Sequence, residues 1–330
     1  MTVDSLTITG ADVTAQVALP LQADSPLDKF VDPFATFVTD VLTLNPVLLQ
    51  LLVFGLLIGG VYALTALGLT MIFGVMDIIN FAHGAFLVMG MYTTFVLTST
   101  FGINAFLTLP AALVFLFVAG WIIERLVIEP IIDSPEQNQL IVTIGLWYIL
   151  GSTIEIIFSP DPQRIDLRLG SLALGDVFIP YGQLLGLFVA GIAMAVIWGF
   201  LQYTDRGRSI RGTADNRTGA QYVGIDITRM NALTFAFGAA LAGIAGAAVA
   251  LFRQFDPFTG TTFLVNAFII VVLGGLGSFP GAFVAGLIIG LAEVFGSYYL
   301  PGTTYQIGIF GIFIAILLVK PEGLFGGKQT

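Results

Sequence analysis

The sequence contains no cysteine and has little of the equipment that most enzymes use. Of its 330 residues, one is histidine and three are lysine, and charged residues make up only 10%. The missing cysteine excludes disulfides, thiolate metal sites and cysteine nucleophiles. A soluble domain carries about 25% charged residues, so most of this surface cannot be covered by water-compatible groups. These shortages exclude an ordinary soluble enzyme.

Positive charge is also scarce, and the motifs of several function classes are missing. There are 12 lysine and arginine residues against 21 aspartate and glutamate residues, which gives a net charge of −9 and excludes a nucleic-acid partner. No cluster has the spacing of metal ligands, so we predict no metal, no cofactor and no catalytic residue. The Gly327-Lys328 pair lacks the rest of a phosphate-binding loop. The chain is therefore predicted not to be an enzyme, and any ATP-driven motor must be a separate subunit.

Apolar residues are abundant instead. They make up 57% of the chain, and the mean hydropathy is +0.96. A membrane-spanning helix needs about 20 mostly apolar residues. Nine segments qualify: 48–75, 78–98, 103–124, 138–159, 181–202, 230–251, 262–278, 280–299 and 304–319. The last three are short or tightly spaced, which allows re-entrant or half-crossing helices there. The predicted fold is all-α, a polytopic membrane bundle of about 8 to 10 transmembrane helices.

The chain divides into three parts by composition. Residues 1–46 form an acidic, polar N-terminal extension with six aspartates and no long apolar run, with a short interfacial helix near 34–44. No basic stretch leads into an apolar core there, so we expect no cleaved signal peptide. Residues 47–320 form the transmembrane domain, which includes a polar loop at 203–229, and residues 321–330 form a tail.

The distribution of cations predicts how the bundle is oriented. Five of the twelve cations lie in the 203–229 loop: Arg206, Arg208, Arg211, Arg217 and Arg229. Lysine and arginine are retained on the cytoplasmic side of membranes. Placing this loop in the cytoplasm puts eight cations inside and four outside. Nine crossings then place the N-terminus outside and the C-terminus in the cytoplasm.

The same loop contains a short predicted helix. The run from Thr213 to Asn216 is typical of a helix start, and the run from Gly219 to Gly224 is typical of its end. A helix of two turns is marginal alone, which favours docking on a partner. The alternative is a solvated loop whose arginines contact lipid headgroups.

Polar groups inside apolar segments are the candidate pathway residues, because they are costly there unless they serve a purpose. Asn80 and His83 lie three residues apart on one helix face, and Glu293 lies deep in the 280–299 segment. The first two either face a passage or form a hydrogen-bonded pair between helices. Glu293 either lines the pathway or is hydrogen-bonded in a helix seam. Asp77 is expected to cap the start of the second segment.

Several motifs carry a family resemblance. The sequences GVYAL (60–64), LGLTM (67–71), INFAHG (79–84), RGRSIR (206–211) and VLGGLGSFPGA (272–282) are similar to those of LivH-type permeases of branched-chain amino acid ABC transporters. The last motif is the most specific, and the resemblance covers about residues 48–326. It implies the fold of an ABC importer permease and, as substrate, a branched-chain or other aliphatic amino acid.

The resemblance also implies partners and a coupling site. The partners would be a second related permease, two ATP-binding subunits and an extracytoplasmic solute-binding protein. A coupling helix over 214–224 would sit in an ATP-binding subunit, with roles for Arg211, Ala214, Asp215, Gly219 and Gly224. One departure is Ala85, where such permeases often have glutamate.

Three other functions stay open from the sequence. Permeases for urea and short amides share the motif around His83, so a urea or amide permease is the main alternative. A stand-alone ion-coupled carrier would use Asp77, His83 or Glu293 as a proton relay. A membrane-embedded enzyme has no nucleophile motif to support it.

Overall fold

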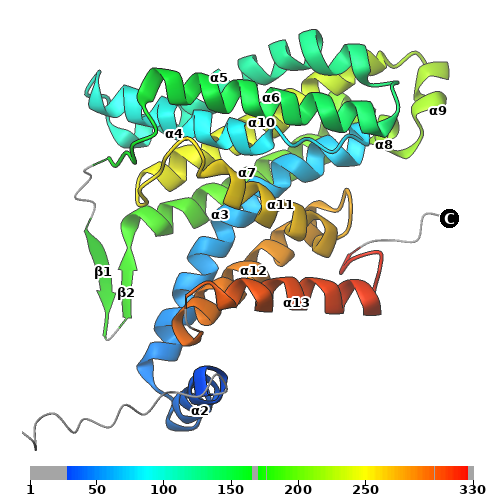
Figure 1. The fold of residues 1–330 in the computed structure, drawn as a ribbon. Helices are drawn as coiled ribbons and strands as arrows, with labels where there is room; N and C mark the ends of the chain where they lie inside the picture. Colours follow the sequence, from blue (N-terminus) through cyan, green and yellow to red (C-terminus); the bar gives the residue numbers. More distant parts are fainter. Residues whose placement is uncertain (1–27, 166–169, 176, 301, 326–330) are drawn as a thin grey trace, which may run out of the picture.

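The computed structural model describes residues 28–165, 170–175, 177–300 and 302–325, and Figure 1 shows their fold. Predictions that concern residues 1–27, Arg168 and 326–330 lie outside the described residues. The helices are α2 (Asp28–Thr43), α3 (Pro46–Met76), α4 (His83–Ser99), α5 (Ala105–Ile123), α6 (Glu136–Phe158), α7 (Tyr181–Tyr203), α8 (Asp205–Asp215), α9 (Arg217–Tyr222), α10 (Ile227–Ala250), α11 (Gly260–Gly274), α12 (Phe279–Tyr299) and α13 (Thr304–Val319). A π-helical turn (Glu124–Ile128) and a 3₁₀ turn (Glu129–Ile131) extend α5.

All nine predicted apolar segments are helical, which confirms the all-α membrane bundle. Six helices are long and apolar enough to cross a membrane: α3, α5 with its extension, α6, α7, α10 and α12. The shorter ones are α4, α11 and α13, with 17, 15 and 16 residues. Of the last three segments, 262–278 and 304–319 form short helices, whereas 280–299 forms the 21-residue α12, which begins five residues after α11 ends.

The second segment begins later than predicted because its first residues form a turn. Asp77 ends α3 in the left-handed backbone region (φ 57°), and its N–H bonds to the carbonyl of Phe73. Helix α4 begins only at His83. The prediction that Asp77 caps the start of the next helix is therefore wrong, since it caps the end of the previous one.

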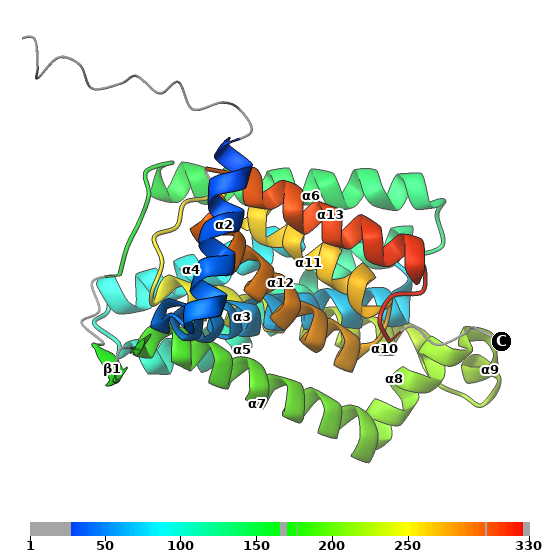
Figure 2. The same ribbon diagram turned by 90° about the horizontal axis from the view of Figure 1, so that it is seen from below.

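A small β-hairpin and the cation-rich loop lie at opposite ends of the bundle (Figure 1). Strands β1 (Ser171–Leu174) and β2 (Val177–Pro180) pair antiparallel, with Leu174 opposite Val177. The side chain of Gln50 on α3 bonds to both the N–H and the carbonyl of Phe178, at 2.7 and 2.8 Å. Helices α8 and α9 lie at the other end, on the same side as the end of α13 (Figures 1 and 2).

The centre of the bundle is held together by close helix contacts at small residues. Helix α12 packs along α3, and glycines lie on both sides of this seam. A β-carbon on Gly290 would lie 2.3 Å from the Cα of Gly59, and one on Gly286 would lie 2.6 Å from the Cα of Ala63. Between helices in lipid, such close approach provides the packing that the hydrophobic effect cannot.

We expect Gly290→Val to separate α3 from α12 and to lower the yield of folded protein. The added methyl groups have no space against Gly59, and overpacking of this kind costs about 1–3 kcal/mol or more. Gly311→Val is the matched control, because a β-carbon there meets no other described segment within 4 Å. Thermal unfolding of the two detergent-purified variants measures the difference. Equal stability of both would contradict a packed glycine seam.

Candidate functional site: a cleft at Glu293 and a cavity at the coupling segment

Glu293 lies at a junction of three helices rather than alone in an apolar segment. The hydroxyl of Tyr62 on α3 donates to Glu293 Oε2 at 2.6 Å, and the amide of Asn266 on α11 lies 3.4 Å from the same oxygen. Tyr62 is 1% exposed and Asn266 is 8% exposed. Two buried donors thus fix one carboxylate oxygen and the position of the side chain on α12.

A cleft of about 220 Å³ opens beside this carboxylate. It is lined by Thr261, Thr262, Val265, Asn266, Ile269, Glu293, Tyr305, Gln306, Ile309 and Phe310, from α11, α12 and α13. A carboxylate with neighbouring hydroxyl and amide groups can bind an ammonium group, while the apolar side chains can contact an aliphatic chain. The cleft therefore has the chemistry needed for a small apolar amine or amino acid.

The sequence did not predict the two partners of Glu293. Asn266 had a detectable signal, because it is an amide inside the apolar 262–278 segment. Tyr62 had none, because it lies 231 positions away from Glu293 and tyrosine is common in membrane helices. Only the packing of α3 against α12 brings the two together.

Asn80 and His83 lie in another part of the bundle, and both are fully buried. Asn80 Oδ1 accepts the N–H of Ala82 at 3.0 Å and so shapes the turn before α4. His83 Nε2 lies 2.9 Å from the carbonyl oxygen of Thr65 on α3. Their side chains thus have separate partners, and neither residue lines the cleft at Glu293. Their pathway role stays a prediction, and the contact of His83 with α3 favours the alternative of a tie between helices.

His83→Leu distinguishes the two roles. We expect less folded protein, because the substitution removes a buried hydrogen bond worth about 1 kcal/mol between α4 and α3. The measurement is the amount of assembled, membrane-inserted protein together with uptake per assembled molecule. Normal assembly with reduced uptake would instead support a pathway role for His83.

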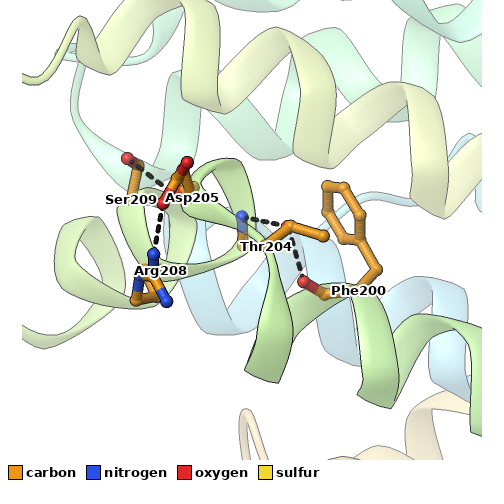
Figure 3. Close-up of polar contacts among 6 residues, drawn as sticks. Phe200, Thr204, Asp205, Arg208 and Ser209 are labelled. Carbon is orange, nitrogen blue, oxygen red and sulfur yellow. Dashed lines mark hydrogen bonds and ion pairs between the residues drawn. The ribbon is translucent and has the colours of Figure 1, made fainter.

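At the opposite end from the β-hairpin, a sharp corner joins α7 to α8 (Figure 3). The hydroxyl of Thr204 accepts the N–H of Gly207 at 2.9 Å and donates to the carbonyl of Phe200 at 2.7 Å. Asp205 pairs with Arg208 in the first turn of α8. An N-cap and an acidic first turn stabilise the free N–H groups there, so the corner starts α8 at a fixed angle.

The predicted continuous helix over 214–224 is wrong, because two helices meet there. Ala214 and Asp215 end α8, and α9 begins after Asn216. Asn216 is extended (φ −156°, ψ 96°), and its side chain accepts the N–H of Gly219 at 2.7 Å. Asparagine favours such a cap over a helix interior, which explains the break. Gly224, as expected, lies at the end, with φ 85°.

A cavity of about 440 Å³ lies beside the end of α8. Arg211, Ala214 and Asp215 line it together with residues 277–280 of the VLGGLGSFPGA motif and with Thr70 and Gly74 at the end of α3. Arg211 Nη1 donates to Gln202 Oε1 at 2.7 Å. Two motifs that are more than 60 positions apart in the sequence therefore share one cavity. Gly219 and Gly224 lie outside this cavity, on and just after α9.

Two apolar side chains are exposed at the end of α9, which the sequence did not predict. Tyr222 is 86% exposed and Val223 is 78% exposed. Arg217 at the start of α9 pairs with Asp133, in the loop before α6, at 3.3 Å. Residue type alone does not predict that Tyr222 and Val223 are exposed, because tyrosine and valine are also found inside proteins. An exposed aromatic and aliphatic pair on a polar loop is typical of a protein contact.

No group of three or more metal-ligating side chains occurs among the described residues.

Comparisons with known proteins agree with the motifs. A family model described as the permease component of branched-chain amino acid transport systems matches residues 51–319. The permease protein LivH of a high-affinity branched-chain amino acid transport system in Escherichia coli K12 is 34% identical over 301 residues, which covers 86% of this chain and 96% of LivH. BraD of Pseudomonas aeruginosa, with the same kind of name, is 32% identical over 299 residues, with 86% and 97% covered.

A more distant relative is LivM of Escherichia coli K12, which is named as a permease protein of the same kind of transport system. It is 23% identical over 292 residues, which covers 80% of this chain and 67% of LivM. No solved structure gave a significant match. The family model matches most of the chain, and the glycine-rich, nine-segment bundle agrees with a membrane permease. The chain belongs to the family of permease components of branched-chain amino acid transport systems.

Proposed function

We propose that this chain is a transmembrane permease subunit of an ATP-driven importer for branched-chain and other aliphatic amino acids. The observation that carries the proposal is the cleft at Glu293, in a chain of this permease family. Its carboxylate would bind the substrate ammonium group, and Val265, Ile269 and Ile309 would contact the aliphatic side chain. The geometry supports this assignment because charge and apolar surface are adjacent in one small space.

The cavity beside α8 supports a coupling role for this end of the bundle. Arg211, Ala214 and Asp215 line this cavity together with residues 277–280, which lie in the turn before α12 and at its start, and α9 begins two residues after Asp215. A force applied to α9 would reach α12, the helix that carries Glu293, through this cavity wall. Gly219 and Gly224 would let α9 form as a short separate unit.

Three kinds of protein partner follow from this proposal. The chain lacks a phosphate-binding loop, so two separate ATP-binding subunits would supply the energy. A second related permease would complete the passage, as the similarity to both LivH and LivM supports. An extracytoplasmic solute-binding protein would deliver the amino acid.

We propose that the end with α8 and α9 faces the cytoplasm. All five loop arginines are exposed or partly exposed near this end, which agrees with retention of cations inside. The β-hairpin and the N-terminal extension would then face outward, and the C-terminus would be cytoplasmic. Domain boundaries at 46 and 320 fit this scheme, with 321–330 as a cytoplasmic tail.

Transport by the reconstituted complex tests the proposal. The chain, its partner permease and the ATP-binding subunits are placed in liposomes, and the solute-binding protein is added on the substrate side. Uptake of labelled leucine and labelled urea is then measured with and without ATP. We expect ATP-dependent leucine uptake that excess urea does not reduce. Uptake of urea in place of leucine would favour the amide permease. Leucine uptake that needs a proton gradient and not ATP would favour the ion-coupled carrier.

A further inference from the structure

Helix α2 precedes the region that the family model matches, and it runs across the bundle instead of along it. The family match begins at residue 51, whereas α2 covers Asp28–Thr43. Figure 2 shows α2 crossing the direction of α12 and α13, close to the first turns of α3. Only Leu44 and Asn45 separate α2 from α3, and Leu44 lies in the left-handed backbone region (φ 49°). This tight turn holds α2 at the level where α3 begins.

The side chains of α2 divide into two stripes. Phe34, Phe37, Val38 and Val41 recur at the spacing of one helix face, and all four are exposed. The opposite face carries Asp32, Thr36, Thr39 and Thr43. A helix with one apolar and one polar face needs an apolar environment on one side only. The structure leaves that apolar side partly open, from 37% exposure at Phe37 and Val38 to 67% at Phe34.

The open apolar stripe continues onto the surface of the bundle itself. A groove of about 650 Å³ joins Phe37 and Val41 on α2 to Leu49 and Leu52 on α3 and to Phe295 on α12. Leu49 and Leu52 are 55% and 44% exposed and lie in a membrane-spanning helix. Since lipid covers exposed apolar residues of a spanning helix, the same lipid layer reaches the stripe on α2.

A polar tether fixes α2 in this position. Asp40 is 7% exposed, and its two oxygens accept the amide of Asn45 at 2.7 Å and the hydroxyl of Tyr299 on α12 at 2.8 Å. The ring of Phe37 packs edge-on against Tyr299, with the ring centres 5.3 Å apart. Asp40, one of the six aspartates of the acidic extension, therefore packs against the bundle.

We propose that α2 lies in the membrane interface, with its apolar stripe in the lipid, and that Asp40 pins it to the end of α12. The occupant is lipid rather than a protein partner, because the stripe is continuous with the lipid-facing start of α3. The phenylalanine and valine side chains of the stripe favour insertion of α2 into the lipid without requiring a cationic face on the helix. The inference does not depend on the substrate of the permease.

The absence of cysteine makes the test direct, because a single introduced cysteine can be labelled without reaction at any native cysteine. Spin labels are attached to Phe34→Cys and Val38→Cys on the apolar stripe, and to Thr36→Cys and Thr39→Cys on the polar stripe. The full transporter is placed in phosphatidylcholine and phosphatidylglycerol nanodiscs. Collisions with oxygen, which dissolves in lipid, and with a water-soluble nickel chelate are then measured.

The two stripes should respond in opposite ways. We expect frequent oxygen collisions and a loss of nickel collisions at 34 and 38, with the reverse at 36 and 39. Nickel collisions at all four positions would show a solvated helix and overturn the proposal. Protection of 34 and 38 from both reagents would show that a protein subunit covers the stripe, which would also overturn it. Uptake is measured in a separate assay, so a failure of transport does not affect the interpretation of the collision measurements.

The tether is tested in the same experiment. Tyr299→Phe keeps the ring against Phe37 but removes the hydroxyl that bonds to Asp40. We expect the contrast between the two stripes to shrink in this variant, because α2 is then free to rotate. An unchanged contrast would overturn the role of Asp40 as the anchor and leave the turn at Leu44 as the sole restraint.

Discussion

Replacing Glu293 with glutamine is expected to reduce ATP-driven leucine uptake about tenfold or more, while the transporter still assembles. Glutamine fits the same space and can still accept the hydroxyl of Tyr62, so the helix junction is retained. The negative charge that faces the substrate ammonium group is lost. Hydrogen bonds to charged groups contribute about 1.5–3 kcal/mol, and each 1.4 kcal/mol is a factor of about ten. Initial rates of uptake into proteoliposomes provide the measurement.

Two further variants make that result specific. Tyr62→Phe removes one donor to Glu293 but leaves the charge, so we expect a smaller loss than for Glu293→Gln. Glu136→Gln is a matched control, because this glutamate is exposed in the first turn of α6 and does not line the cleft. Full uptake by Glu293→Gln, with normal assembly, would rule out the cleft as the ammonium site.

The second large effect is expected at α9. Changing Tyr222 to alanine together with Val223 to aspartate should abolish uptake and release the ATP-binding subunits during purification. Both side chains are largely exposed, and a buried tyrosine anchor at an interface is worth about 2 kcal/mol or more. An aspartate in the same contact adds an unpaired buried charge. Copurification of the ATP-binding subunits with the tagged permease provides the measurement.

The neighbouring Gln221 supplies the control for α9. It is exposed on the same helix, and Gln221→Ala removes a polar side chain without touching the apolar pair. We expect normal copurification for this variant. If the Tyr222 and Val223 double variant also retains the ATP-binding subunits and uptake, then α9 is not the docking element.

A second variant of the coupling segment is less specific. Asp215→Arg with Gly219→Trp should also abolish uptake while the protein still reaches the membrane. However, a β-carbon at Gly219 would lie 3.1 Å from the side chain of Asn216, which caps α9. A tryptophan there therefore disturbs the helix itself as well as its contact with a partner. By contrast, substituting Tyr222 alters only an exposed side chain.

Much of the fold could be predicted from the sequence because lipid imposes a simple rule. Every spanning backbone must satisfy its own hydrogen bonds, so long apolar runs become helices. All nine apolar segments obey this rule, and errors occur only at their ends. The predicted start of α4 is too early, because the chain forms a turn between Asp77 and Asn80. Asp77 has a left-handed backbone conformation, and the side chain of Asn80 accepts a backbone N–H in place of a helical hydrogen bond.

The candidate site could be predicted only in part. Glu293 was visible because a carboxylate in an apolar segment is costly. Its partners Tyr62 and Asn266 were not, because they come from helices that only packing brings together. Conversely, the sequence left open whether Asn80 and His83 face a passage or form a hydrogen-bonded pair, and in the structure each side chain has its own backbone partner.

The sequence by itself determined the class of protein: a cysteine-free, apolar chain with few charges must form a membrane bundle, and its motifs indicate the permease family. Tertiary structure alone decided which residues share a site. Glycine seams let α3 and α12 approach closely, and that approach brings Tyr62 to Glu293. It likewise decided that Asp40 ties α2 to Tyr299. The physical reason is that hydropathy is a property of each segment, whereas side-chain contacts depend on how helices rotate and pack against one another.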